Sequence, residues 1–586
     1  MAPCLLPALA TGHEVAGVLS GHPRKDLMRG CTLLFKHRFA TLATTCASLA
    51  LGTLASPHTT LGQRLPVGDP EEAYLRVLQV SGLTYIGGSF LLRPLGADAA
   101  FRNLTDTTDH PWSSRFGAWD PPSGKANVRL VTHDPSLRAV YNSGFPENDN
   151  IGALTPGRGF TFAFKSGATL RAGPLTVTAR PLVAFAQNVE FPLATVEVPG
   201  QPKYAYPWRL MDLPQRFGPD PFWTLDPGQS EVRLDLRGVS ASFGTTNLWW
   251  GPGVRNGIIV SNNAAGFPHA SLATHHPVDL GIGSLEAQWI WGRLQQSDWF
   301  DDSYDDPGRF VTGATVTFSP RGLGLDGLSL GVARMFYALV PDDGVGVGEY
   351  FLIFQTPEKQ ALVTPDNPTG DDERDQLFSA FARWVLPGSG FEAYLEWARN
   401  DHGADVRDLF LQAEHAQAYS LGFQKATLLD GDRILSFRGE LTHLERPTSQ
   451  LLRDTPTFYA HHLVRQGYTQ KGQVVGAFVG PGGDAQFVGA DLYAPWGRAS
   501  IYLQRWVHDQ DALIDRAVGN SDWGHWRTDV SGTAGGSLMV FLGQLDVEGR
   551  MSLTRNFNRH FVHRSDKHNF RADVSVRWRV GWRDPT

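Results

Sequence analysis

The sequence predicts an all-β fold: a large antiparallel transmembrane β-barrel of about 18 strands with a small, partly helical N-terminal periplasmic segment. Two observations support this prediction. From about residue 157 onward, polar and apolar side chains alternate with a period of two, as they do on strands with one wet face and one apolar face. Outside the N-terminal region, no apolar run reaches the roughly 18 residues that a membrane-spanning helix requires.

The segment from Phe570 to Trp582 shows the alternation most clearly. Its apolar positions are Phe570, Ala572, Val574, Val576, Trp578, Val580 and Trp582, and its other positions are Arg571, Asp573, Ser575, Arg577, Arg579 and Gly581. On a helix these arginines would be scattered around the axis, whereas on a strand they line one side. The segment is therefore predicted to be a strand.

The same pattern recurs at 231–237, 391–397 and 545–553, and more weakly at 160–170, 175–186, 285–292, 328–337, 419–425, 434–442 and 499–507. Soluble sandwiches and propellers also alternate. Strand lengths near ten residues, aromatic residues such as Trp397 and Trp578 near strand ends, and the absence of a repeat of about 40 residues favour a membrane barrel. The charged faces must then line the lumen, because each basic group facing lipid costs roughly 2–4 kcal/mol near the midplane.

Three regions are expected. Residues 1–55 are interpreted as an N-terminal extension and a signal peptide, because Lys36 and Arg38 precede an uncharged stretch that ends in small residues near Ala55. Residues 56–150 are predicted to be a partly helical periplasmic segment at one barrel mouth, with a helix that starts at Asp69-Pro70 and stops near Gly82. Residues 151–586 are predicted to form the outer-membrane barrel.

Composition excludes several classes of protein. The formal net charge of −7 argues against a nucleic-acid partner. All three cysteines precede residue 50, which excludes a disulfide framework or a cysteine–metal site in the folded body. The chain contains no P-loop or His-Glu-x-x-His motif. We therefore expect no catalytic residue, no metal and no cofactor, although a pair of lumen carboxylates could in principle hydrolyse a glycan.

Several segments resemble the Wzi-type capsule-assembly family of outer-membrane proteins. The most specific is Asn247-Leu-Trp-Trp-Gly-Pro-Gly-Val-Arg-Asn-Gly257, followed by Ser261-Asn-Asn-Ala-Ala-Gly-Phe-Pro-His269. Weaker ones lie at 148–159, 173–181, 212–218, 391–401 and 461–472, so the resemblance extends over most of residues 70–510. It implies an 18-stranded monomeric barrel in the bacterial outer membrane that holds capsular polysaccharide at the cell surface. The end of the sequence departs from the usual barrel pattern, because Trp582 is followed by Arg-Asp-Pro-Thr instead of ending on an aromatic residue.

Six residues are candidate saccharide contacts: Trp249, Trp250, Asn256, Asn262, Asn263 and His269. Ring faces can pack on sugar C–H surfaces, and amides can bind hydroxyl groups. Alternatively, Trp249-Trp250 ends a strand at the membrane interface and Gly251-Pro-Gly turns the chain, which is the favoured interpretation of this pair. Asn262, Asn263 and His269 are equally compatible with a loop inserted into the lumen.

The acidic segment Asp301 to Asp306 could bind calcium, but its spacing is more typical of a solvated loop. The predicted function is to bind extracellular or capsular polysaccharide and to assist its assembly or attachment, with outer-membrane lipid as the second partner. The alternative is a porin or a substrate-selective channel. An open lumen would favour a channel, and a lumen closed by loops and the N-terminal segment would favour attachment.

Overall fold

The computed structural model describes residues 64–96, 110–116, 128–301, 308–322, 324–341, 344–355, 374–400 and 406–580, all within the compact unit Pro57–Thr586. The predicted signal peptide, Asp302 to Asp306 and Trp582 lie outside the described residues. Among the helices that are described, none is both long enough and apolar enough to cross a membrane.

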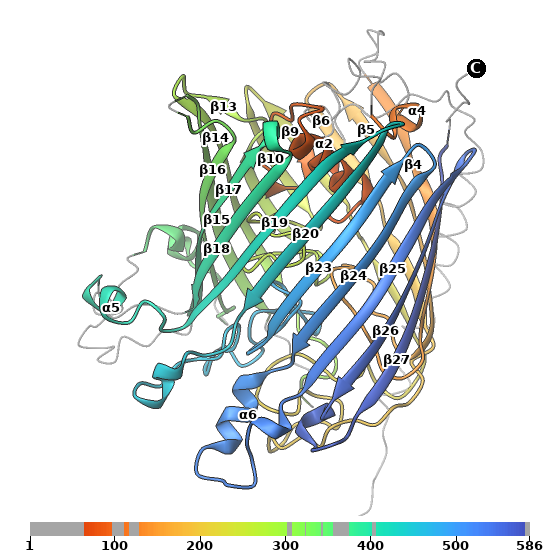
Figure 1. Cartoon of the computed structure of the whole chain (residues 1–586). Helices are drawn as coiled ribbons and strands as arrows, with labels where there is room; N and C mark the ends of the chain where they lie inside the picture. The colour runs from red at the N-terminus through yellow and green to blue at the C-terminus, as the bar shows by residue number, and fades with distance from the viewer. Residues whose placement is uncertain are drawn as a thin grey trace, which may run out of the picture. The chain divides into compact units, whose positions relative to one another are not determined.

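The described strands form a closed antiparallel barrel of 18 strands, as predicted (Figure 1). Three of these strands are each interrupted once, giving the pairs β6/β7, β8/β9 and β12/β13. β6 and β7 both pair with β5, β12 and β13 both pair with β14, and β8 and β9 pair with β7 and β6 in turn. The barrel segments are β4 (Val128–Asn142), β5 (Gly159–Ala172), β6 (Leu175–Ala179), β7 (Leu182–Ala186), β8 (Phe222–Asp226), β9 (Glu231–Leu236), β10 (Val239–Gly244), β12 (His269–Thr274), β13 (Val278–Asp279), β14 (Gly283–Leu294), β15 (Arg309–Pro320), β16 (Leu328–Leu339), β17 (Arg374–Leu386), β18 (Phe391–Asn400), β19 (Gln417–Leu429), β20 (Arg433–His443), β23 (Asp484–Ala494), β24 (Gly497–Val507), β25 (Val530–Leu542), β26 (Leu545–Phe557) and β27 (Lys567–Trp578).

The final predicted strand is observed as β27, which closes the barrel by pairing with β4 from Arg571↔Asn142 to Arg577↔Ser136. Its apolar side chains, including Phe570, Val574 and Trp578, are exposed on the outer wall. Its charged side chains face the lumen, where Arg571 binds Asp149 at 3.1 Å. The predicted register is therefore confirmed, since the charges are paired inside the barrel.

The barrel begins earlier than residue 151, the boundary predicted from the sequence. β4 spans residues 128–142 and pairs with β27 and β5, so it belongs to the wall. Its pairing with β5 shifts between His133 and Ser136, at the Asp134-Pro135 pair. Proline has no N–H for the ladder, and the resulting irregularity breaks the period-two alternation, which hid this strand in the sequence.

The two ends of the barrel differ in their connections (Figure 1). At one end the turns are short, such as Gly543-Gln544 between β25 and β26. At the other end long segments connect the strands, including 187–221, 245–268, 444–483 and 508–529. Outer-membrane barrels generally have short periplasmic turns and long extracellular loops, so the long-loop end corresponds to the outside in that class.

The predicted helix is observed as α2 (Pro70–Ser81), capped by the Asp69 side chain and ended by Gly82 in the left-handed conformation. It lies inside the barrel near the short-turn end (Figure 1). Tyr74, Leu75 and Leu78 pack against lumen-facing residues of the wall, among them Ile434 and Tyr493. This N-terminal segment therefore plugs the short-turn end of the lumen.

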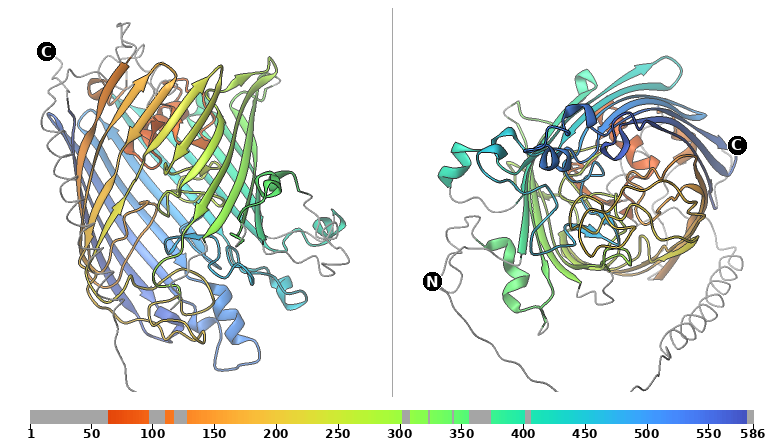
Figure 2. Two further views of the ribbon diagram at one scale, coloured as in Figure 1. Left: turned by 180° about the vertical axis from the view of Figure 1, so that it is seen from behind. Right: turned by 90° about the horizontal axis from the view of Figure 1, so that it is seen from below.

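Loops from the other end fill the rest of the lumen, as the end-on view shows (Figure 2, right). Their buried side chains, including Ile258, Tyr459 and Tyr468, form one apolar cluster with wall residues such as Met335 and Leu377. The remaining small elements are β1 (Arg64–Leu65) with β3 (Leu95–Gly96), β2 (Leu92–Arg93) with β11 (Trp249–Trp250), β21 (Thr469–Gln470) with β22 (Gln473–Val474), α4 (Ser113–Phe116), α5 (Val406–Leu411), α6 (Gln510–Ala517), η1 (Val347–Phe354), η3 (Pro387–Ser389), η4 (Thr448–Leu451), η5 (His525–Arg527) and η6 (Arg559–Phe561).

Candidate functional site

A wall carboxylate, Glu440, helps to hold the luminal loop 245–268 in place. Glu440 of β20 accepts hydrogen bonds from the backbone N–H groups of Val254 at 2.7 Å, Arg255 at 2.9 Å and Asn256 at 2.8 Å. It also accepts the Tyr394 hydroxyl at 2.8 Å and the Asn256 side-chain amide at 3.2 Å. A buried carboxylate needs such donors to replace water, and here the loop backbone supplies them. Asn256 thus helps to hold this loop to the wall. We call the N-terminal segment and the loops that fill the lumen the plug.

Asn262 and Asn263 connect this loop to other parts of the plug. The Asn262 side-chain amide donates to the carbonyl oxygens of Val67 at 3.2 Å and Asn150 at 3.1 Å. The Asn263 amide donates to the carbonyl oxygen of Val474 at 2.8 Å. The interpretation of these asparagines as members of a lumen-inserted loop is therefore correct, and their amides hold together segments that are distant in sequence.

Trp249 and Trp250 form β11, which pairs with β2 of the N-terminal segment instead of ending a strand at the membrane interface. Trp249 is 2% exposed and lies under the Arg93 guanidinium, whose carbon is 4.3 Å from the ring centroid. Trp250 is 0% exposed and donates from Nε1 to Gln288 at 2.8 Å. The interpretation that this pair ends a strand at the membrane interface is therefore wrong. The sequence was misleading because apolar residues of a loop that folds into the lumen can flank a turn in the same way as residues at the end of a strand.

His269 opens β12 and is buried, with Nδ1 2.9 Å from the carbonyl oxygen of Phe267. The six residues predicted as saccharide contacts therefore lie in the plug or against it; five of them are buried, and Asn262 is partly exposed. A saccharide could reach Trp249 and Trp250 only if loop 245–268 moved. Their role as saccharide contacts stays a prediction.

Charged groups in the lumen are paired with the plug. Glu392 of β18 lies between Arg76 of α2 and Arg383 of β17, with Nε to carboxylate distances of 2.7 Å to each. On the opposite wall, Arg577 binds Asp69 at 2.8 Å. The cavity beside this pair has a volume of about 40 Å³, which is room for a few water molecules at most. Along this side, the N-terminal segment closes the short-turn end.

An aromatic cluster lies at the long-loop end, where three loops meet. It contains Trp208 from segment 187–221, Trp523 from segment 508–529 and Phe561 from η6, and Trp526 follows three residues after Trp523 in the same loop. The ring centroids of Trp208 and Phe561 are 4.9 Å apart. Trp526 is 45% exposed, and Trp208 and Trp523 are partly exposed. We call Trp208, Trp523 and Trp526 the tryptophan surface.

Two arginines stack on the tryptophan surface. The guanidinium carbon of Arg516 is 4.6 Å from the Trp208 ring centroid and 5.8 Å from that of Trp523. Arg527 lies 4.9 Å from the Trp523 centroid. Asn558 fixes the neighbouring backbone by donating to the carbonyl oxygen of Trp526 at 3.0 Å. The exposed part of the Trp526 ring, beside polar groups held in place, is suited to bind a sugar ring from solvent.

The base of these loops contains a buried acidic group. Asp511 of α6 accepts the backbone N–H of Arg446 at 2.9 Å and lies 3.4 Å from the Arg446 guanidinium. Burial raises the pKa of Asp511 to about 6, partly offset by the charge of Arg446. Its neighbour Asp509 caps α6 and binds Arg209 at 2.8 Å. The position of α6 therefore depends on a carboxyl group that titrates just below neutral pH.

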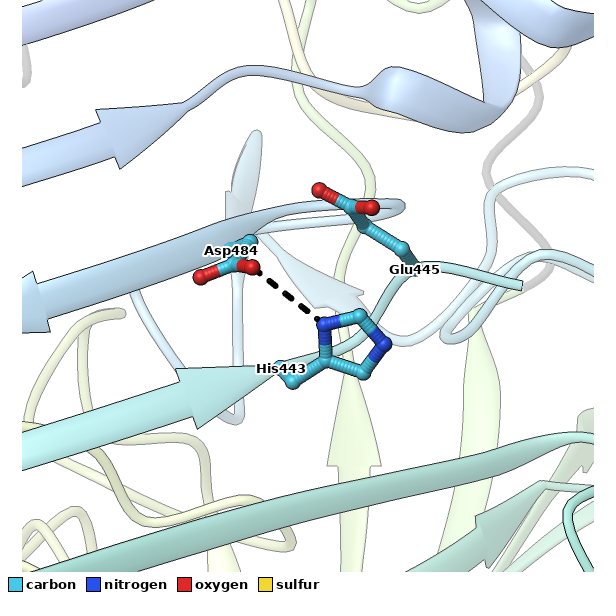
Figure 3. Close-up of side chains that lie close together, drawn as sticks. All are labelled: His443, Glu445 and Asp484. Atoms are coloured by element: carbon cyan, nitrogen blue, oxygen red, sulfur yellow. Dashed lines mark hydrogen bonds and ion pairs between the residues drawn. The ribbon is translucent and has the colours of Figure 1, made fainter. Parts of the chain in front are cut away.

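One cluster could hold a cation, although the sequence predicted no metal site. Figure 3 shows His443 at the end of β20, Glu445 just after it, and Asp484 at the start of β23. One potential ligand atom from each lies within 4.8 Å of the others, and His443 Nδ1 is 3.4 Å from Asp484 Oδ2. Register, not sequence spacing, brings these residues together, because His443 pairs directly with Asp484.

The tryptophan surface was not among the residues predicted from the sequence. Trp523-Gly-His-Trp526 lies between two alternating segments, which is the only sequence signal that marks it as an aromatic-rich loop. Its partner Trp208 is more than 300 residues away along the chain. No short motif could indicate that these side chains meet.

Comparison with known families adds a further observation. The model of the family described as "Capsule assembly protein Wzi" matches residues 224–494, a range that contains both the Trp249-Trp250 segment and Glu440. The resemblance to the Wzi capsule-assembly family is confirmed. No curated protein sequence gives a significant match.

Solved structures are similar to this barrel in fold. The Wzi protein of Escherichia coli, described as an outer membrane protein involved in group 1 capsule assembly and a carbohydrate-binding β-barrel, is 14% identical, with 88% of this chain and 99% of that chain covered and a TM-score of 0.58. OccK2 (OpdF) of Pseudomonas aeruginosa is 12% identical, with coverage of 76% and 97% and a TM-score of 0.35. OprD of the same species is 11% identical, with coverage of 77% and 94% and a TM-score of 0.35. At these identities, the comparison with Wzi shows the fold.

Proposed function

We propose that this Wzi-type barrel lies in the bacterial outer membrane as a monomer, binds extracellular or capsular polysaccharide, and assists its assembly or attachment at the cell surface. The observation that supports this most directly is the contrast between the filled lumen and the exposed surface of the long loops. The lumen is filled by α2 and by loops that Glu440 anchors, whereas the tryptophan surface is open at the long-loop end.

Two features support the outer-membrane placement. The barrel is closed, so its wall leaves no unpaired edge in lipid. Large apolar side chains such as Ile501 and Leu553 are exposed on the outer wall. The long-loop end, with the tryptophan surface, then faces the outside. A polymer outside the cell would meet the tryptophan surface first.

Binding, as opposed to catalysis or diffusion, is the activity that this arrangement suits. A porin needs a continuous water path, and here hydrogen-bonded loops from 245–268 and 444–483 occupy the lumen. Tyr459 illustrates this, since its hydroxyl donates to the carbonyl oxygen of Ile258 at 2.7 Å and accepts the N–H of Ala477 at 2.9 Å. The E. coli Wzi protein is itself described as carbohydrate-binding.

The decisive experiment is deletion of the gene in a strain that produces its surface polymer, followed by measurement of cell-bound and released polysaccharide. We expect polymer to shift from the cell to the medium, and complementation with the wild-type gene to restore retention. The double variant W523A/W526A should bind the purified polymer about tenfold more weakly, which corresponds to about 1.4 kcal/mol. Y85A removes an exposed aromatic residue from the N-terminal segment and should bind as the wild type does. Unchanged retention after deletion would contradict the proposed function.

A further inference from the structure

The outer wall of the barrel contains a groove of about 720 Å³ over β23 to β27. Its floor is strand β25, which contributes the small outward residues Gly532 and Ala534 to the lining, and the next outward residue along the strand, Gly536, is also small. The intervening Thr533 points inward, because its hydroxyl lies 2.9 Å from that of Thr554 in a buried contact. A Cβ added at Gly532 would have no heavy atom within 4 Å, so the space above this residue is open.

Larger apolar side chains form the sides of the groove. In the register of the sheet, Leu503 and Leu553 flank Ala534. One row further toward the short-turn end, Ile501 and Met551 flank Gly536. All four of these side chains are exposed, as expected of a wall that faces lipid. In two successive rows, small residues of β25 thus lie between larger apolar side chains of β24 and β26.

Two arginines border the groove at its long-loop end. Arg505 and Arg555 pair with Gly532 from either side, so their Cα atoms are two strand spacings, or about 10 Å, apart. His568 lies opposite Arg555 in the next strand and also lines the groove. The row that follows the apolar rows is therefore cationic, with the open space above Gly532 at its centre.

The arginines retain donors for a ligand. Arg505 donates from Nη1 to Gln486 at 2.8 Å, and Arg555 donates from Nη2 to Asp566 at 2.8 Å. Each guanidinium has five N–H donors, and each of these bonds uses one. The side chain of Arg555 is half exposed despite its bond to Asp566. Arginine pairs of this kind bind phosphate through parallel charge-assisted hydrogen bonds.

We propose that this groove binds an anionic, phosphate-bearing lipid of the outer leaflet. Its phosphate lies over Gly532 between Arg505 and Arg555, and one acyl chain lies over Ala534 and Gly536. The apolar rows continue directly into the cationic row, which fits an amphiphile and not a free phosphate ion. The inference rests on the proposed placement of the barrel in the outer membrane, and it concerns a surface that the proposed polysaccharide function does not use.

The test measures lipid binding to the full purified barrel in detergent by native mass spectrometry. The probes are diphosphorylated lipid A and the same lipid with its phosphates removed. We expect the wild type to bind the phosphorylated form at least tenfold more tightly. R505Q/R555Q should abolish this difference without changing the binding of the dephosphorylated form, and A534L should weaken binding of both. R433Q, which removes an exposed arginine at the short-turn end, is the matched control.

Equal binding of the two lipids by the wild type, or a preference that persists in R505Q/R555Q, would overturn the proposal. Displacement of the lipid by millimolar inorganic phosphate alone would show an ion site and also overturn it. If the double variant does not fold, as judged by heat-modifiable mobility, R505Q and R555Q singly should each reduce the preference. The lipid assay contains no polysaccharide, and W523A/W526A should retain the lipid preference. Failure of this inference and failure of the proposed function are therefore distinguishable.

Discussion

The carboxylate of Glu440 accepts the backbone N–H of Asn256 at 2.8 Å, and this contact joins the barrel wall to the loop that fills its lumen. The same carboxylate accepts the N–H groups of Val254 and Arg255. Because hydrogen bonds to a charged group contribute about 1.5–3 kcal/mol each, Glu440 contributes strongly to the position of loop 245–268.

We expect the wild-type barrel to show no large, stable conductance steps in planar bilayers, since its lumen is filled. E440A removes the acceptor for three loop amides and should produce frequent openings. E440Q keeps one acceptor oxygen and should have a smaller effect. Large stable steps in the wild type would contradict the plugged lumen and favour a channel.

Removal of one partner from the Arg577–Asp69 pair should loosen the N-terminal segment. R577Q leaves the Asp69 and Glu71 carboxylates without this arginine, and breaking a buried pair typically costs about 3–5 kcal/mol. The measurement is the rate at which a protease cleaves residues 64–96 in the purified barrel. D69N/R577Q should recover part of the protection, and a cleavage rate unchanged by R577Q would argue against this docking contact.

The outer wall should tolerate charge poorly. Ile501 is 69% exposed on β24, and I501R should destabilise the barrel in lipid vesicles by roughly 2–4 kcal/mol, as measured by guanidinium unfolding. Val518 is similarly exposed, at 66%, but lies in the loop after α6, so V518R should leave stability nearly unchanged. Equal effects of the two substitutions would mean that Ile501 does not face lipid.

The α6 loop should become less stable as the pH rises through about 6. The folded-state pKa of Asp511 is raised to about 6 by burial, above its ordinary value of 3.8, so protonation favours the folded loop. This contribution is complete below about pH 4 and is lost above about pH 6. Hydrogen-exchange protection of residues 510–518, corrected for the intrinsic rate at each pH, should be greater at pH 5 than at pH 8. D511N should abolish the difference, and protection that rises with pH would contradict the argument.

Much of the wall could be predicted because side chains of a membrane-spanning strand alternate strictly: polar ones face the lumen and apolar ones face outward. In β27 the charged residues Arg571 and Arg577 could only face inward, which fixed the face and the register together. The helix α2 could also be predicted, since Asp69, Pro70 and Gly82 are local signals for the start and the end of a helix.

The interior was not predictable in the same way. Trp249 and Trp250 look like a strand end in sequence, and only the long-range pairing with Arg93 and Leu92 places them in the plug. The tryptophan surface depends on Trp208 meeting Trp523, which lies on a different loop, and the arginine-bordered groove depends on the register of β24, β25 and β26. Such contacts follow from closure of the barrel, and a local pattern does not encode them.

The position of α2 has a consequence for biogenesis. Its acidic N-terminal turn binds Arg577 and Arg579, which lie on or just after β27, the strand that seals the wall against β4. These partners become available only when the last hairpin is inserted. The contacts that hold the N-terminal turn of the helix can therefore form only late in assembly. Folding of the plug and completion of the wall are, on this geometry, a single late step, and mutations in the seam should yield barrels that are both leaky and slow to mature.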